Sequence, residues 1–193
     1  TVNPAHELAA KKILAEHFGL PVCCGHEMSD QLNFRVRANT AVLNARIIPL
    51  LTTFLRDARD ALRSAGIEAP LMVVKGDGSL MSESLAAARP VETVLSGPAA
   101  SVAGARHLTG CDNALVVDIG GTTSDLARVR QGIVAVCPEG ASVGGWRTHV
   151  RALDMRTVGF GGDSAIVWDK QQLLVGPQRV APVAWLASEH DLG

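Results

Sequence analysis

The sequence predicts an α/β fold in which the pattern of elements changes partway along the chain. Up to Leu108, segments with helical periodicity alternate with short apolar runs, a pattern typical of a parallel α/β layer. From Ala114 onward, short apolar runs follow one another with glycine turns between them, which predicts an antiparallel meander. The pattern of predicted elements therefore changes near residue 110.

Composition favours a folded protein and argues against a nucleic-acid or membrane partner. The 193 residues are 47 % hydrophobic and 19 % charged, with a formal net charge of −1. This charge gives no basic face for nucleic acid. No apolar run approaches the ~20 residues of a membrane span. The first residues lack the apolar core of a signal peptide, so we expect a cytoplasmic protein.

The cysteines fit a reduced, intracellular chain better than a disulfide framework, because no C-x-x-C spacing occurs among Cys23, Cys24, Cys111 and Cys137. A metal site made by Cys23, Cys24 and His26 is an alternative. Leu20–Cys24 reads as a short strand, however, and adjacent residues of a strand point to opposite faces. We therefore interpret the cysteines as buried structural thiols.

The first part of the chain contains two predicted helices. Asn3 and Pro4 are typical of a helix start, and Gly19 is typical of a helix end. Thr40–Ala65 has apolar residues at helical spacing, with Pro49 expected to kink this helix or to start a second one. The polar segment between the two helices is expected to be irregular.

A strand over Leu71–Lys75 leads into the turn KGDGS (residues 75–79). Ligands gather at the carboxyl ends of strands in open α/β sheets. Lys75 is thus a candidate for binding a phosphate or a carboxylate, and Asp77 for binding water or metal. A plain Asp-Gly turn at Gly78 is the alternative. Further expected elements are a short helix capped by Ser82, a strand over Val91–Leu95 and an Ala-rich helix over Ala99–Leu108.

The stretch LVVDIGGTTSDLARV (residues 115–129) organises the second part of the chain. Gly120 and Gly121 join two strands, and we expect them to take φ > 0 and to let a ligand approach the backbone. Consecutive amides in such a turn bind anions, and the Thr122 and Thr123 hydroxyls add donors. Asp118 and Asp125 suit a Mg²⁺ shell. The turn therefore reads as a site for a Mg²⁺-bound polyphosphate, with an ordinary β-hairpin as the alternative.

Later segments predict more strands and a second glycine loop. Strands are expected over Ile133–Val136, Trp146–Leu153, Ala165–Trp168 and Leu173–Val175. The loop over residues 154–164 ends in four candidate ligand-binding residues, with plain turn chemistry as the alternative: Gly161, Gly162, Asp163 and Ser164. The tail after Pro177 has no clear pattern.

Six segments resemble the A subunit of the hydantoinase/oxoprolinase family, within the sugar kinase and actin superfamily of ATPases. They are GHEMS (25–29), KGDGSLMS (75–82), RPVETVLSGPAASVAGA (89–105), VVDIGGTTSDLA (116–127), VGGWRTHV (143–150) and DMRTVGFGGDS (154–164). The resemblance covers residues 20–176 and implies a ribonuclease H-like (actin-like ATPase) fold with parts of two domains. Residues 1–110 would be the end of a first α/β domain, and residues 111–193 would be the start of a second domain that carries the phosphate hairpin. The resemblance also implies that the chain is a fragment, inactive alone, because members of the family carry an earlier phosphate hairpin.

The resemblance implies ATP-dependent hydrolysis of a cyclic amide such as a hydantoin or 5-oxoproline, or a reaction on a carbonyl substrate as in carboxylase relatives. Asp118 and Asp125 would be catalytic. ATP would be bound by residues of three loops: Lys75, Asp77, Gly78, Gly120, Gly121, Thr122, Thr123, Gly161, Gly162 and Ser164. Magnesium would be held by Asp118, Asp125 and Asp163. A hydantoinase B-type subunit is the implied partner, and a homo-oligomer is left open.

Two other functions remain alternatives at this stage. One is a regulatory module that binds nucleotide without chemistry, and the other is a small-molecule kinase of the same superfamily. The loop GFGGDS departs from the GAGGGS of better-known members of the family. A carboxylate at Asp163 would repel a bound anion, which leaves the substrate and the hydrolysis step open.

Overall fold

The protein is described by a computed structural model covering residues 3–20, 22–182 and 185. The chain divides into two compact units. The first contains the described residues of 1–100 and 136–153, and the second contains those of 101–135 and 154–193. Both mix helices with sheets, so the α/β class is confirmed. The two units are defined by contacts within this chain alone, so they do not test the predicted boundary near residue 110 between two domains of the superfamily. That boundary stays a prediction.

The first helix, α1 (Ala5–Phe18), begins one residue later than Asn3 and Pro4 predicted, because Pro4 is its N-cap, and it ends at Gly19 as predicted. The Ala5 amide donates to Asn3 Oδ1 at 2.9 Å, and Gly19 ends the helix with φ +60°. The strand expected over Leu20–Cys24 is wrong, because Cys24 caps a short helix, α2 (Gly25–Met28). The Glu27 carboxylate accepts the Cys24 amide at 3.1 Å, which is the reciprocal contact of a capping box and favours a helical turn here.

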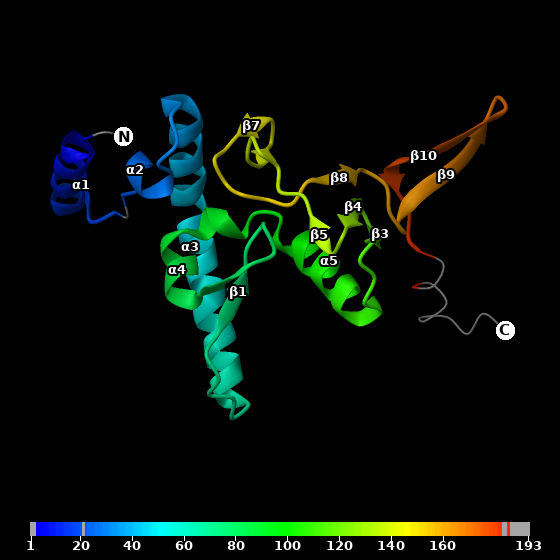
Figure 1. The fold of residues 1–193 in the computed structure, drawn as a ribbon, viewed down its shortest axis with the longest axis horizontal. Helices are drawn as coiled ribbons and strands as arrows, with labels where there is room; N and C mark the ends of the chain where they lie inside the picture. The colour runs from blue at the N-terminus through cyan, green and yellow to red at the C-terminus, as the bar shows by residue number, and fades with distance from the viewer. Residues whose placement is uncertain (1–2, 21, 183–184, 186–193) are drawn as a thin grey trace. The chain divides into compact units, whose positions relative to one another are not determined.

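The long helix α3 (Phe34–Ser64) begins six positions before the predicted start at Thr40. Asn33 caps it with φ +84°, and its side chain accepts the Val36 amide at 3.3 Å. The helix continues through Pro49, so no second helix begins there. Figure 1 shows α3 as the longest element of the first unit, with α4 beside it.

A hairpin replaces the parallel layer expected in the first part of the chain. Strand β1 (Met72–Val74) pairs antiparallel with β2 (Leu80–Ser82), with Val73 opposite Met81. The connecting turn, residues 75–79, is too short for the crossover that parallel strands need. Every strand pairing among the described residues is antiparallel, so the parallel expectation is wrong.

Two α-helices follow this hairpin, and the strand predicted between them does not form. Ser82 caps α4 (Glu83–Ala88) as predicted, with its hydroxyl accepting the Leu85 amide at 3.3 Å. The strand expected over Val91–Leu95 is instead a 3₁₀ turn, η1 (Pro90–Thr93). Pro90 at its first position sets a helical φ. The Ala-rich helix is confirmed as α5 (Ser96–Thr109) and runs across the division between the units.

Asn44 on α3 organises the core of the first unit. Its side chain is fully buried, accepts the Val91 amide at 3.1 Å and donates to the Ala88 carbonyl at 3.1 Å. It thereby satisfies backbone groups at the α4–η1 junction that no sheet or helix could satisfy. Two apolar clusters complete this core: Met28, Val91, Ala141, Val150 and Ala152 in one, and Leu55, Met81 and Ala86 in the other.

Most of the strand expected over Trp146–Leu153 is absent. Only β7 (Trp146–Arg147) forms, paired with β6 (Ser142–Val143). The following backbone bonds to distant residues instead. The His149 amide donates to Thr40 Oγ1 at 2.9 Å, and the Leu153 amide donates to the Gly76 carbonyl at 2.9 Å.

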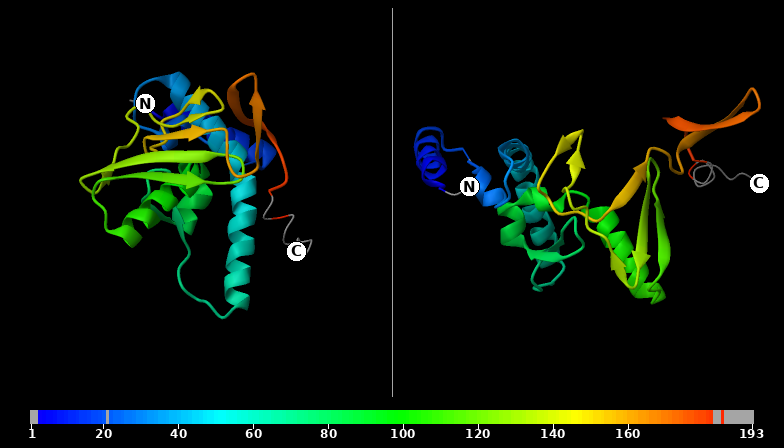
Figure 2. Two further views of the ribbon diagram at one scale, coloured as in Figure 1. Left: turned by 90° about the vertical axis from the view of Figure 1, so that its right-hand side faces the viewer. Right: turned by 45° about the horizontal axis from the view of Figure 1, so that its top comes forward.

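The second unit is built on a four-stranded antiparallel sheet and a separate ribbon. The sheet contains β3 (Ala114–Ile119), β4 (Ser124–Arg130), β5 (Ile133–Val134) and β8 (Met155–Val158), with β4 bonded to the other three. The ribbon pairs β9 (Ser164–Asp169) with β10 (Gln172–Arg179), which confirms the two late strands. Figure 2 shows the β3–β4 pair from two directions.

The first prediction concerns Asn44. Replacing it with Ala leaves the buried Val91 amide and Ala88 carbonyl without partners, and we expect unfolding free energy to fall by about 1–3 kcal/mol or more. Asn39→Ala is the matched control, because Asn39 makes one exposed bond to the Arg147 carbonyl. Urea unfolding followed by circular dichroism measures both variants. Equal losses in the two would contradict the assigned role of Asn44.

Candidate functional site

The turn between β3 and β4 is the first part of the candidate site. The Gly120 amide donates to the Thr123 carbonyl at 2.9 Å and closes the turn. Thr122 is exposed and Thr123 half-buried. The expectation of φ > 0 at Gly120 and Gly121 is wrong, since neither residue has a positive φ. A Cβ at Gly120 would make ordinary contact with the Thr123 carbonyl oxygen at 3.4 Å, and a Cβ at Gly121 would meet the end of the Asp163 side chain.

A second glycine loop, residues 159–164, docks on this turn through the backbone. The Gly162 amide donates to the Gly120 carbonyl at 2.9 Å, and the Asp163 amide donates to the Gly121 carbonyl at 2.8 Å. A Cβ on Gly161 would lie 2.3 Å from the Gly120 oxygen. Only glycine allows this approach. The structure thus brings together two of the three loops that contain the predicted site residues.

Serine side chains hold the second loop in place. Ser164 Oγ accepts the Gly161 amide at 2.9 Å, and the Ser164 amide donates back to the Gly161 carbonyl at 3.0 Å. The Ser124 hydroxyl is 1 % exposed and donates to the Phe160 carbonyl at 2.9 Å. Ser164, a predicted ligand-binding residue, therefore shapes the loop in this structure.

Asp118 and Asp125 lie directly opposite each other in the β3–β4 register, and Thr157 of β8 continues the same row. Residues opposite each other in an antiparallel pair share a face of the sheet. Asp125 accepts a hydrogen bond from the Thr157 hydroxyl at 2.5 Å. Two like charges at directly opposite positions are unfavourable without a cation. This row of oxygen donors at the end of the turn suits a hard cation such as Mg²⁺.

Asp163 lies beside the turn and is paired with a residue that the sequence did not indicate. Its carboxylate forms an ion pair with Arg179 of β10 at 2.5 Å. A Cβ on Gly121 would lie 2.8 Å from Asp163 Oδ2, so the carboxylate is close to the turn. Arg179 offsets its charge there. The predicted role of Asp163 in metal binding is untested and stays a prediction.

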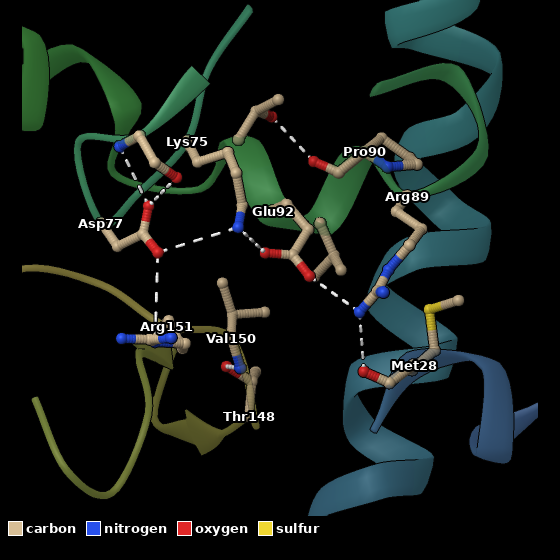
Figure 3. A network of polar contacts seen from close by, with 12 residues as sticks. Met28, Lys75, Asp77, Arg89, Pro90, Glu92, Thr148, Val150 and Arg151 are labelled. Atoms are coloured by element: carbon tan, nitrogen blue, oxygen red, sulfur yellow. Dashed lines mark hydrogen bonds and ion pairs between the residues drawn. The ribbon is translucent and has the colours of Figure 1, made fainter. Parts of the chain in front are cut away.

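Lys75, Asp77 and Gly78 belong to the first unit, where Lys75 and Asp77 join an ionic network (Figure 3). Lys75 Nζ lies 3.3 Å from Glu92 Oε2 and 3.7 Å from Asp77 Oδ2. Glu92 also pairs with Arg89 at 2.8 Å, and Arg89 donates to the Met28 carbonyl at 2.9 Å. The network fixes the ammonium group of Lys75 between two carboxylates.

Asp77 is held as a carboxylate. Burial alone would raise its pKa, but hydrogen bonds from the Ser79 hydroxyl and amide, with the charges of Lys75 and Arg151, outweigh burial and lower it. Ser79 Oγ donates to Asp77 Oδ1 at 2.6 Å. Gly78 has φ +81°, as a tight turn requires, and Gly76 could not carry a Cβ, which would lie 2.2 Å from the Val94 carbonyl oxygen.

A polar pocket of about 340 Å³ opens beside this network. Burial, followed by the charge of Arg37, lowers the pKa of His149 in its wall, which favours the neutral imidazole. Sequence reasoning missed His149 and three of the charged residues that line the pocket with Lys75: Arg89, Glu92 and Arg151. Arg89, Glu92 and His149 lie in segments that resemble the family, and Arg151 directly follows one of them, but only the fold brings these residues near Lys75.

The cysteines differ in their surroundings. Cys24 is buried, Cys23 and Cys137 are half-buried, and Cys111 is exposed. The interpretation of all four as buried thiols is therefore wrong for Cys111, which follows the end of α5 in a polar turn.

The second prediction tests the docking of the two glycine loops. Gly161→Ala places a Cβ against the backbone of Gly120 and Gly121. This backbone cannot move aside without breaking the two hydrogen bonds that the amides of the second loop donate to it. We expect a loss of about 1–3 kcal/mol in stability, typical of overpacking, and faster hydrogen exchange at the Asp163 amide. Gly162→Ala is the matched control, because its Cβ would meet only the Gly120 oxygen, at 3.9 Å. Equal exchange rates in the two variants would contradict the docking.

The described residues contain no helix that is both long and apolar enough to cross a membrane.

Comparison with known proteins identifies relatives of this chain. The chain is 28 % identical to the caprolactamase subunit alpha of Pseudomonas jessenii over 183 residues, covering 91 % of the chain and 26 % of that protein. It is 27 % identical to the 5-oxoprolinase of Saccharomyces cerevisiae, covering 92 % of the chain and 14 % of that protein.

A solved structure agrees with these relatives. The nucleotide-free structure of acetone carboxylase, an enzyme of ATP-dependent acetone carboxylation, matches with a TM-score of 0.74 at 26 % identity, over 92 % of this chain and 26 % of that one. The chain thus spans about a quarter or less of the length of these proteins. The family model described as hydantoinase/oxoprolinase matches residues 37–183. The chain belongs to the hydantoinase/oxoprolinase family.

Proposed function

We propose that this chain is the phosphate-binding part of an ATP-dependent enzyme that opens a cyclic amide of the hydantoin or 5-oxoproline type. The observation that carries the proposal is the backbone docking of the second glycine loop on the β3–β4 turn, beside the paired carboxylates of Asp118 and Asp125. The ATP-dependent relatives support the use of ATP.

The turn has the donors that a polyphosphate needs. The Gly121 amide and the Thr122 and Thr123 hydroxyls are candidates for binding phosphate oxygens, and consecutive amides favour anions. Gly161 and Gly162 set the depth of this surface by their contact with Gly120. Asp118 and Asp125 would hold Mg²⁺, which screens the repulsion between phosphate and carboxylate.

Catalysis of phosphoryl transfer consists mostly of positioning and charge neutralisation. Transfer of a phosphoryl group from ATP to the amide oxygen would make the carbonyl carbon more electrophilic, so that water can add to it. The ring C–N bond would then break, with a proton going to the nitrogen, and a second water would release the phosphate and leave the open-chain carboxylate. In the proposed mechanism, Asp118 orients the attacking group. Asp125 is held in place by the hydrogen bond that it accepts from the Thr157 hydroxyl. The positive charge of Arg179 offsets the negative charge of Asp163 near the phosphate.

Lys75, Asp77 and Gly78 are proposed as a second group of binding residues. The Lys75 ammonium is held between Asp77 and Glu92, so its direction is set before a ligand arrives. The mixed charges of the adjoining pocket suit a polar amide substrate better than an apolar one. A B-type subunit is proposed as the partner, because the caprolactamase relative is itself named as a subunit.

Product analysis tests the proposal, using the assembled protein with ATP and hydantoin, 5-oxoproline or a lactam. We expect phosphate release coupled to ring opening. Bicarbonate-dependent carboxylation of a ketone would indicate instead the chemistry of the acetone carboxylase relative. A phosphorylated product would indicate a kinase, and nucleotide binding without any product would indicate a regulatory module.

The third prediction tests the catalytic role of Asp118, one member of the acidic pair. Asp118→Asn removes one charge from the cation site, and we expect turnover to fall by about 100-fold or more, as for loss of a transition-state electrostatic contact. The control is Asp169→Asn, which removes a charge from an exposed position at the end of β9. Steady-state phosphate release measures both. Full activity of Asp118→Asn would refute the catalytic assignment.

A further inference from the structure

Three metal-binding side chains meet where α1 adjoins α2. Glu7 comes from the first turn of α1, Cys24 caps α2, and His26 lies within α2. One ligand atom of each lies within 4.8 Å of the corresponding atoms of the other two. The strand that would have separated adjacent residues here does not form, so the geometric argument against a metal site at Cys24 no longer applies.

The three side chains are already ordered around one another. His26 Nδ1 lies 2.8 Å from Glu7 Oε2, and the His26 amide donates to the same oxygen at 2.9 Å. The Cys24 thiol donates to the Glu7 carbonyl at 3.5 Å. Cys24 is 4 % exposed, whereas the side chains of His26 and Glu7 are 20 % and 32 % exposed. A cation could therefore enter past the imidazole and the carboxylate and reach the sulfur last.

The ligand set is that of zinc. A thiolate, an imidazole nitrogen and a carboxylate oxygen are the three ligand types that Zn²⁺ takes in proteins. A hard cation such as Mg²⁺ would avoid the sulfur. One thiolate and one carboxylate would neutralise the two charges of the ion.

Neighbouring groups leave these ligands available. Lys11, the nearby cation of α1, pairs with Glu27 at 2.6 Å rather than with Glu7. Glu27 uses its other oxygen to accept the Cys24 amide. Cys23 is occupied elsewhere, because its sulfur accepts from Asn44 at 3.3 Å. The two adjacent cysteines therefore have different surroundings.

Helix α1 is the element that metal bonds at this site would stabilise. It has no buried residue among those described, and Leu8, Ile13, Leu14 and Phe18 are all exposed. Its described attachments to α2 are the polar contacts of Glu7 and Lys11. Small elements with little apolar burial are commonly fixed by a metal or a disulfide.

We propose that Glu7, Cys24 and His26 form a zinc site that fastens α1 to α2, with water in the fourth position. On binding, the Cys24 thiol loses its proton to solvent and the sulfur bonds to zinc, while the hydrogen bond between His26 and Glu7 is replaced by two metal bonds. No redox change is involved. The proposal does not rest on the proposed ATP-dependent activity, and its cobalt test reads metal binding alone, although His26 also lines the pocket offered to the substrate.

Cobalt(II) titration of the purified, metal-stripped 193-residue chain tests the site, because a thiolate–cobalt bond gives a charge-transfer band in the near ultraviolet. We expect the intensity of this band to saturate at one cobalt ion per chain. Added zinc should displace the cobalt and abolish the band. Cys24→Ser should remove it. Cys23→Ser, the matched control, should keep it. Glu7→Gln and His26→Gln, at partly exposed positions, should weaken cobalt binding by about 10- to 100-fold or more while the metal-free circular dichroism spectrum is unchanged.

Two results would overturn the proposal. One is the absence of a thiolate band in the folded unsubstituted chain. The other is a band that survives Cys24→Ser or disappears in Cys23→Ser, since either would place the metal on another sulfur. If Cys24→Ser does not fold, the Glu7→Gln and His26→Gln variants decide the question, because unchanged cobalt affinity in both would exclude the site.

Discussion

The contact between two glycine loops is the constraint on which the candidate phosphate site depends. Two amides of the second loop donate to two successive carbonyls of the β3–β4 turn, at 2.9 and 2.8 Å. Gly161 makes this possible, because any side chain there would meet the turn backbone. The remaining features follow from this contact: the serines brace the loop, Asp163 is brought to Gly121, and Arg179 supplies the opposite charge.

The acidic pair depends on the same arrangement. The β3–β4 register places Asp118 opposite Asp125, and pairing of β8 with β4 adds Thr157 to the row. Strand β8 leads directly into the second glycine loop, so the strand that completes the row also delivers the loop to the turn. One local topology therefore accounts for both the proposed anion-binding surface and the proposed cation site.

Sequence reasoning succeeded where local pattern decides the structure. The β3–β4 hairpin, the β9–β10 ribbon, α5 and the Ser82 cap all follow from alternation, glycine position and capping chemistry. It failed where distant hydrogen bonds outweigh strand propensity. Val91 bonds to Asn44, and His149 bonds to Thr40. No local pattern in residues 91–95 or 146–153 signals those partners.

The candidate site was predictable in part for the same reason. Gly-Gly, Thr-Thr and the flanking aspartates mark the turn, and the second glycine loop is visible in sequence. The partners of the charged residues are not. Lys75 meets Glu92, Asp77 meets Arg151, and Asp163 meets Arg179 only through the fold. The positive φ predicted for Gly120 and Gly121 was also wrong, and the position in this contact where the neighbouring backbone excludes a Cβ is Gly161.

The most direct test of the central claim is a nuclear magnetic resonance titration of the ¹⁵N-labelled chain with Mg·ATP, up to the ~mM concentrations that weak phosphate binding of about −4 kcal/mol requires. If the two glycine loops form one phosphate site, the amide signals of residues 120–123 and 161–164 shift together with one dissociation constant. Lys170 and Gln171, at the tip of the β9–β10 ribbon, stay unchanged. Shifts confined to the ribbon, or different constants for the two loops, would contradict the account.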